Sequence, residues 1–262
     1  MKRRYTLTGL VVFALVSVAI AMASVLRDPR QLDAPAQQER ADETVTPVVD
    51  FNVPAPADPK EKALRHTRSK LYDYAGDLAE ARKFSLTEKS EPILLDLPLS
   101  DGAKESPIPV QQADAVVVGK ITDARAYLSN DKTNVYSEFT AALEDVLLND
   151  PSGSLYTGAL IATQRRGGAV KFPSGKRLVR GQLGRTMPHE GQRYLLFLRK
   201  NADGQTFSII TGYALVNGKV TPLDGLSKKA PQLAQFAAYE NADEATFLNQ
   251  VRETISKERS RG

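Results

Sequence analysis

The chain of 262 residues has no cysteine and no tryptophan, and its two histidines are His66 and His189. The absence of cysteine excludes disulfide bonds, thiolate metal sites and a cysteine nucleophile. Two histidines are too few for a multi-histidine metal site within one chain. We therefore expect neither a metal nor a cofactor, and we find no catalytic signature, which favours a protein that is not an enzyme.

An excess of charge of one sign is also missing once the N-terminus is set aside. The formal charge is +4, but Lys2, Arg3 and Arg4 stand before a long apolar run. Without them, 32 basic residues face 31 acidic residues. A nearly neutral remainder has no general attraction for polyanions, so we do not expect a nucleic-acid partner.

The apolar run itself indicates export. Residues 5–26 carry no charge over 22 positions, enough for a helix of roughly 30 Å, the thickness of a bilayer core. Three basic residues precede the run, which places the N-terminus in the cytoplasm and the rest of the chain outside, in the periplasm or the extracellular space. Residues 1–27 are thus predicted to be a signal anchor, whose transmembrane helix holds the protein in the membrane. The alternative is secretion after cleavage near Ala23, because Ala21-Met22-Ala23 matches a signal-peptidase site.

The segment after the anchor changes composition twice. Residues 28–57 are rich in proline and alanine and poor in large apolar residues, which predicts a disordered tether. Asp58-Pro59 is typical of a helix start, so residues 58–90 are predicted to contain a docked helix. Its apolar residues Leu64, Leu71, Ala75 and Leu78 fall roughly along one stripe.

Residues 106–226 have the pattern of strands. In the long alternating segment from Val135, apolar Phe139, Ala141 and Leu143 share one face. Gly119 interrupts a β-branched run and predicts a bulge or bend. The pairs Asp203-Gly204 and Asn217-Gly218 predict tight hairpins joining strands near 193–200, 206–216 and 219–223. The continuous apolar run 194–198 predicts a strand that is covered on both faces.

The C-terminal part, residues 230–259, is predicted to form helices. Asn241 and Glu244 have capping-box spacing, and Phe247, Val251 and Ile255 fall on one helical stripe. Together these elements predict a mainly β fold with flanking helices. The arrangement that fits best is a small, partly open, OB-like β-barrel behind an N-terminal transmembrane helix.

Four stretches carry a family resemblance: DAVVVGKITDARAYLSNDKTNVYSEFTAALEDVL, GGAVKFPSGK, MPHEGQRYLLFL and TGYALVNGKVTPLDG. They resemble an uncharacterised family of bacterial exported, membrane-anchored proteins, over roughly residues 106–226. That resemblance implies no activity. In layout, the chain also resembles netrin-like OB barrels such as the tissue metalloproteinase inhibitors. Those inhibitors chelate the protease metal through a disulfide-bonded N-terminus, and the absence of cysteine removes that route here.

The sharpest local feature is a basic, glycine-rich stretch from Arg165 to Arg185. It has seven cations, five glycines and no acidic residue. The cations are Arg165, Arg166, Lys171, Lys176, Arg177, Arg180 and Arg185. Such a hairpin is suited to an acidic protein face or an anionic envelope polymer, although a solvated loop has the same composition.

These features predict a membrane-tethered extracytoplasmic binding module whose ligand is a protein or an anionic envelope component. The alternatives are an envelope hydrolase that uses carboxylate chemistry and a structural spacer without a specific ligand. Other leads are weaker. Asp114, Asp123, Asn130 and Asp131 lack the spacing of a calcium loop, and His189 is an isolated histidine before a strand.

Overall fold

The computed structural model describes residues 46–75, 85–90, 93–95, 106–150, 152–227 and 230–260. All of them belong to the unit formed by residues 41–262. The predicted anchor at residues 5–26 and the tether up to residue 45 lie outside the described residues. Within the described ranges, no helix has both the length and the apolarity needed to cross a membrane.

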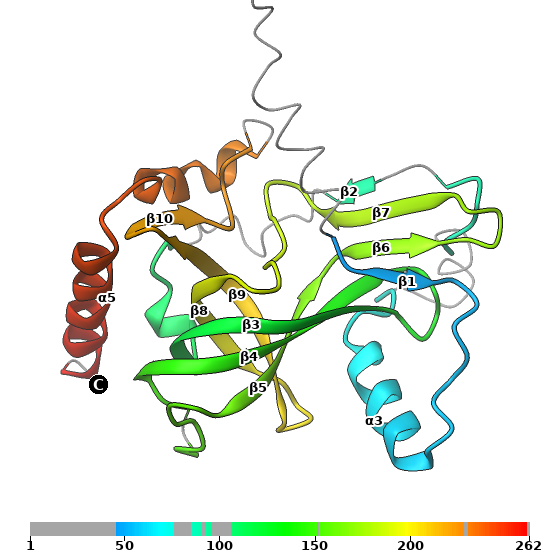
Figure 1. Cartoon of the computed structure of the whole chain (residues 1–262), viewed down its shortest axis with the longest axis horizontal. Coiled ribbons are helices and arrows are strands. Elements are labelled where there is room, and N and C mark those ends of the chain that lie inside the picture. Colours follow the sequence, from blue (N-terminus) through cyan, green and yellow to red (C-terminus); the bar gives the residue numbers. More distant parts are fainter. Residues whose placement is uncertain are drawn as a thin grey trace, which may run out of the picture. The chain divides into compact units, whose positions relative to one another are not determined.

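Strands dominate the described chain, which confirms the prediction of a mainly β fold. The main sheet has the order β10-β9-β5-β4-β3-β8, and β8 also pairs with β9. The strands β3, β4, β5, β9 and β8 therefore form a partly closed ring (Figure 1). Their bounds are Ala115–Leu128 for β3, Val135–Leu148 for β4, Leu160–Arg166 for β5, Arg193–Lys200 for β8, Thr206–Val216 for β9 and Lys219–Pro222 for β10.

Local sequence explains most of this sheet. Asn217 and Gly218 have φ angles of 51° and 72°, as a type I′ turn requires, and they join β9 to β10 where predicted. The register of β3 on β4 shifts next to Gly119, so the predicted irregularity is confirmed. A Cβ at Gly119 would lie 2.8 Å from the carbonyl oxygen of Ala142, so only glycine fits this close approach without a shift of the backbone.

The ring has one apolar core inside and another outside. Phe139, Ala141 and Leu143 of β4 point inward, as their alternation predicted. In β8, Tyr194, Leu196 and Leu198 belong to the inner core, while Leu195 and Phe197 belong to the outer one. The prediction that this strand is covered on both faces is confirmed.

Two C-terminal elements cover the outer core. The 3₁₀ segment η3 spans Pro231–Tyr239, and helix α5 spans Glu244–Arg259. Phe247, Val251 and Ile255 of α5 are buried in the outer core, together with Phe236 of η3. The cap of α5 differs from the predicted one: Asp243 accepts a hydrogen bond from the Thr246 amide, and Asn241 lies in a turn with a φ angle of 62°. A short 3₁₀ turn, η2 (Val110–Gln112), precedes β3.

A second sheet has the order β1-β6-β7-β2, with β1 at Val48–Asp50, β6 at Gly168–Lys171, β7 at Arg177–Gln182 and β2 at Ile93–Leu95. The hairpin β6–β7 is the glycine-rich stretch, and the two three-residue strands run parallel to its outer edges. Residues 48–50 were assigned to the tether by sequence and instead form β1. Such a short strand has no periodicity of its own, and its pairing with β6 decides its structure.

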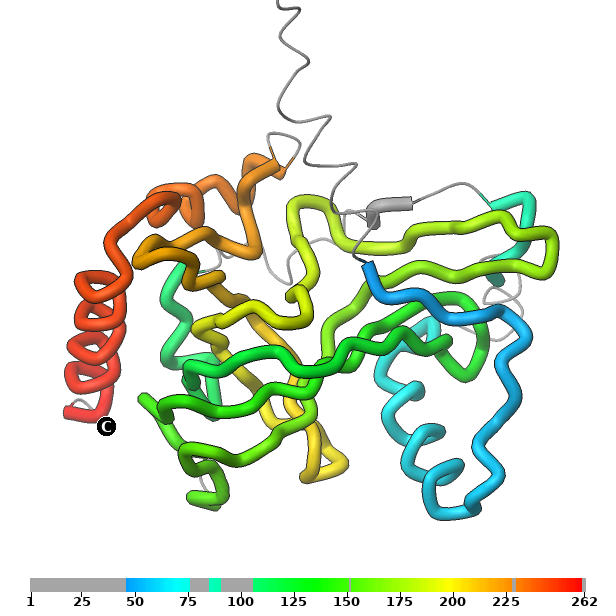
Figure 2. The backbone as a smooth tube through the Cα atoms, in the orientation of Figure 1, coloured from blue at the N-terminus to red at the C-terminus, as the bar shows by residue number. Residues whose placement is uncertain are grey.

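Helix α3 spans Pro59–Lys70 and begins as predicted, because Asp58 accepts a hydrogen bond from the Lys60 amide. The helix is shorter than its sequence indicated, since residues 71–75 form a turn. The face of α3 that packs against the rest of the domain also differs from the predicted one. Leu71, placed on the predicted apolar stripe, is 47% exposed, whereas Ser69 is buried. Figure 2 shows that α3 lies beside the far end of the β3–β4 hairpin.

Candidate functional site

The seven cations of the predicted basic surface lie in different environments. Arg165 and Arg185 converge on the carboxylate of Asp224, which is fully buried and also accepts a hydrogen bond from Thr211. Arg165 itself is only 3% exposed. These two arginines are therefore engaged by a buried acid.

The other five cations are divided between surface and interior. Lys171 and Lys176 are exposed near the β6–β7 turn, and the Lys176 ammonium donates to the carbonyl of Glu88. Arg177 donates to the Thr46 carbonyl, next to β1. Arg180 is buried and Arg166 is half-buried, and burial lowers the pKa of each guanidinium. A binding role for this stretch stays a prediction, with Lys171 and Lys176 as its exposed side chains.

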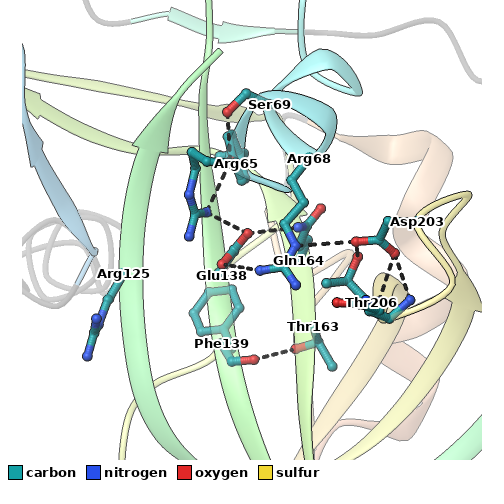
Figure 3. Close-up of polar contacts among 12 residues, drawn as sticks. Arg65, Arg68, Ser69, Arg125, Glu138, Phe139, Thr163, Gln164, Asp203 and Thr206 are labelled. Atoms are coloured by element: carbon teal, nitrogen blue, oxygen red, sulfur yellow. Dashed lines mark hydrogen bonds and ion pairs between the residues drawn. The ribbon is translucent and has the colours of Figure 1, made fainter. Parts of the chain in front are cut away.

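A polar cluster joins α3 to the ring. Glu138 of β4 accepts from Arg65 at 2.7 Å and from Arg68 at 3.4 Å, and its Oε1 also accepts from Gln164. Arg68 reaches further, to Asp203 in the β8–β9 turn, at 3.3 Å. Figure 3 shows these side chains meeting beneath the helix. The helix is therefore held largely by charge pairing, which its apolar stripe did not predict.

Arg65 contacts Glu138, Tyr136 and Tyr127 on this face. Burial acts to lower its pKa, but the hydrogen bond to Tyr136 and the charge of Glu138 outweigh burial and raise it. Its guanidinium also lies 3.4 Å from the centre of the Tyr127 ring. Tyr136 stacks on Tyr72 with ring centroids 4.2 Å apart, and burial raises the pKa of both phenols. These contacts fix the cluster in position.

Beside this cluster lies a groove of about 1030 Å³, which we call the α3 groove. Three segments form it: β1 with the loop that follows, helix α3, and the end of β3. Its apolar lining includes Val48 and Val53, which are 45% and 54% exposed. Its charged lining comprises the cations Lys62, Arg65, Arg125 and Lys132 and the carboxylates Asp50 and Glu61.

Among the described residues, no strand pairs with the edge of β3 that faces this groove. β8 pairs with β3 only over Ala115–Lys120, whereas β4 pairs with β3 as far as Leu128. The amide of Ser129 donates to the Asn134 carbonyl, which places residues 125 and 127 in hydrogen-bonded pairs with β4. Ala124, Ala126 and Leu128 therefore direct their N–H and C=O groups away from β4, and none of these groups bonds to another described residue.

The remaining sequence leads make structural contacts. The amide of His189 donates to the Tyr194 hydroxyl. Asp131 accepts bonds from Ser129, Thr133 and the Tyr74 amide, so it organises the β3–β4 turn. Among the described residues, no group of three or more histidine or acidic side chains is arranged to hold a metal.

Sequence reasoning did not find the α3 groove. The single usable signal was the three-residue spacing of Arg65 and Arg68, which puts both on one helical face. Comparisons add no family to this picture: the chain matches no protein-family model and no curated protein.

Proposed function

We propose that this chain is a membrane-tethered extracytoplasmic binding module that holds a protein ligand in the α3 groove. The observation that carries the proposal is the groove itself, with its apolar patches, its majority of cations and a strand edge that no other described strand pairs with. Ligand-binding pockets combine an apolar surface with a few polar groups that are held in fixed positions. Arg65 is such a group. The uncharged run at residues 5–26 supports the tether.

We also propose that the ring is an OB-like barrel. The support is its pairing order, in which β3, β4, β5, β9 and β8 follow one another and β5 runs parallel to β9. In such barrels, ligands bind to the outer surface and loops of a rigid scaffold. The second sheet and α3 then act as additions that build a groove against one end of the β3–β4 hairpin.

The exposure and pairing of the carboxylates at the groove favour binding over carboxylate hydrolysis. Asp50 and Glu61, the carboxylates that line the groove, are both exposed. Glu138 is beside the groove but is held by two arginines and Gln164. General acid–base chemistry needs a carboxyl group that can reach a substrate proton, and the oxygens of Glu138 are already occupied by these three side chains.

Site-specific photocrosslinking in intact cells tests the proposal. A photoreactive amino acid at Val53, within the groove, is expected to give a defined crosslinked protein in the membrane fraction. The control position is Tyr156, which is 68% exposed and lies outside the groove. Equal crosslinking from both positions, or none from Val53, contradicts binding in the groove. N-terminal sequencing of the membrane fraction tests the tether: residue 1 or 2 is expected first, and a start at Ser24 contradicts it.

A further inference from the structure

The α3 groove offers backbone hydrogen-bonding groups as well as side chains. We propose that its ligand is an extended, acidic segment of a partner protein that adds to the free edge of β3 as a further strand. This inference rests on the proposed binding function and specifies the form of the ligand. An unpaired strand edge is a template for another extended chain, because its N–H and C=O groups already have strand spacing.

Backbone groups along β3 point alternately toward β4 and away from it, and this alternation shows which groups a ligand strand can bond. Ala124, Ala126 and Leu128 each present one N–H and one C=O on the side away from β4. An added strand takes up these groups at every second residue, as β4 does on the opposite edge. The backbone groups of Arg125 and Tyr127 are used by β4, so they contribute through their side chains only.

The two layers beside the edge explain why an extended segment fits. On one face of the hairpin, Ala126 packs with Val49 of β1 and with the second sheet. On the other face, Tyr127 lies against Arg65 of α3. Successive side chains of a strand point to opposite faces. A segment on the β3 edge therefore sends alternate side chains toward β1 and toward α3, both of which line the groove.

Charge complementarity favours an acidic segment. Four cations and two carboxylates line the groove. Lys62 and Lys132 are exposed and have like charge. The Arg125 side chain is 69% exposed and pairs with Asp123 at 2.9 Å, so the two lysines are the cations most open to a ligand. The Lys132 ammonium is 4.6 Å from the centre of the Phe51 ring, which holds it at the groove wall. A basic segment meets like charge at these positions.

Backbone pairing can be tested with a proline at the edge. Ala124→Pro removes one outward N–H and leaves the ladder with β4 intact, because that N–H does not point to β4. The matched control is Leu160→Pro, at the exposed first residue of β5 and outside the groove. The Leu143 amide donates to the Ala159 carbonyl, so these two residues form a hydrogen-bonded pair. Leu160 stands opposite Ala142 in the next pair, which is not hydrogen-bonded. The Leu160 N–H therefore also points away from β4.

The probes are peptides selected from a display library of random twelve-residue sequences on the full-length protein in detergent micelles. We expect enrichment of acidic sequences with alternating β-branched residues. Ala124→Pro should weaken their binding by about 10-fold or more, since one backbone hydrogen bond is lost. Leu160→Pro should not change it. No enrichment, enrichment of basic peptides, or equal binding by both variants overturns the proposal.

Amide hydrogen exchange keeps the test valid if Ala124→Pro fails to fold. In the wild-type protein, a bound peptide should slow exchange at Ala124, Ala126 and Leu128 more than at Tyr127, whose amide already bonds to β4. Uniform slowing along β3 overturns strand addition. Pairing of β3 edges between two copies of this chain is another outcome, and a dimer that Ala124→Pro dissociates overturns the partner assignment.

The acidic preference has its own test. Lys62→Glu together with Lys132→Glu should weaken binding of the selected peptides by at least 10-fold at low salt, with less effect at high salt. Lys60→Glu, on an exposed position of α3 outside the groove, is the charge control. If Val53 crosslinks a partner in cells and Ala124→Pro leaves that crosslink unchanged, groove binding stands and strand addition fails.

Discussion

At the scale of single residues, the main feature of this domain is a buried charge and its partners. The Asp224 carboxylate is fully buried, and its partners Arg165 and Arg185 come from the glycine-rich stretch. A charge removed from water is tolerated only where opposite charge and hydrogen bonds replace the solvent. Part of the local basic excess therefore neutralises a buried acid that lies far along the chain.

Removing this acid should be costly. Asp224→Asn removes a fully buried charge that pairs with both Arg165 and Arg185, and we expect the free energy of unfolding to fall by about 3–5 kcal/mol. Urea denaturation of the two proteins measures the difference. Asp145→Asn is the control, because Asp145 pairs with Arg252 on the surface, where both side chains are 49% exposed. A loss there of about 1 kcal/mol or less is expected, and an equal loss at both positions contradicts the prediction.

Asp150 should make stability depend on acid pH. Burial acts to raise the pKa of Asp150, but the Lys200 ammonium and bonds from Ser152 and Ser154 lower it well below its ordinary value of 3.8. A depressed folded pKa stabilises the protein above the unfolded pKa, and this stability is lost as pH falls through the folded pKa. The difference in unfolding free energy between wild type and Asp150→Asn should therefore shrink from about pH 5 to about pH 2. A difference that is constant over this range contradicts the assignment.

Among the elements, α3 depends most on polar contacts. Arg65 and Arg68 share one carboxylate, that of Glu138, whose side chain is 12% exposed. Ser69 adds a hydrogen bond to the Tyr136 hydroxyl at 3.0 Å. An element attached in this way can open locally without unfolding the ring, because the apolar cores lie elsewhere. The groove wall is thus the part of the ligand site most sensitive to single substitutions.

Glu138→Gln should loosen this helix selectively. It leaves two guanidinium groups without their shared charge, at a cost of about 2 kcal/mol or more. Amide hydrogen exchange in α3 should then be about 30-fold faster, since 1.4 kcal/mol corresponds to a factor of ten. The control is Glu144→Gln, which affects the partly exposed pair with Arg193. Faster exchange throughout the ring as well as in α3 would show global destabilisation and contradict local docking.

For the whole molecule, the C-terminal elements complete the domain. Phe236, Phe247, Val251 and Ile255 cover the outer core that contains Leu195, Phe197 and Tyr213. Without this cover, the outer apolar face of β8 and β9 is exposed to water. The strands predicted at residues 106–226 therefore form the ring, but the cover lies at residues 230–259.

Truncation measures the contribution of this cover. Residues 41–227 should melt far below residues 41–262 or fail to fold, because each large buried apolar side chain contributes about 1.5–3 kcal/mol. Four such side chains together approach the entire stability of an ordinary domain, about 5–15 kcal/mol. Thermal melts followed by circular dichroism compare the two fragments. Matching melting temperatures would mean that the outer core is not needed for folding.

The sequence by itself determined the parts of this protein that depend on neighbouring residues. The turn at Asn217-Gly218, the cap at Asp58, the irregularity at Gly119 and the strand over 193–200 all follow from local backbone and side-chain preferences. The alternating faces of β4 likewise follow from the two-residue repeat of a strand. These rules depend on residues a few positions apart, so a single sequence contains them in full.

Only the tertiary structure decided the candidate site. The strand β1 exists because β6 lies beside it, and the free edge of β3 exists because β8 ends its pairing at Lys120. Arg165 meets an acid 59 positions away, and Arg68 meets Asp203 135 positions away. Contacts at such separations depend on how the chain closes into a ring, which no local pattern specifies. The groove has no sequence signature for the same reason. Three segments form it, and none of them has a distinctive sequence pattern of its own.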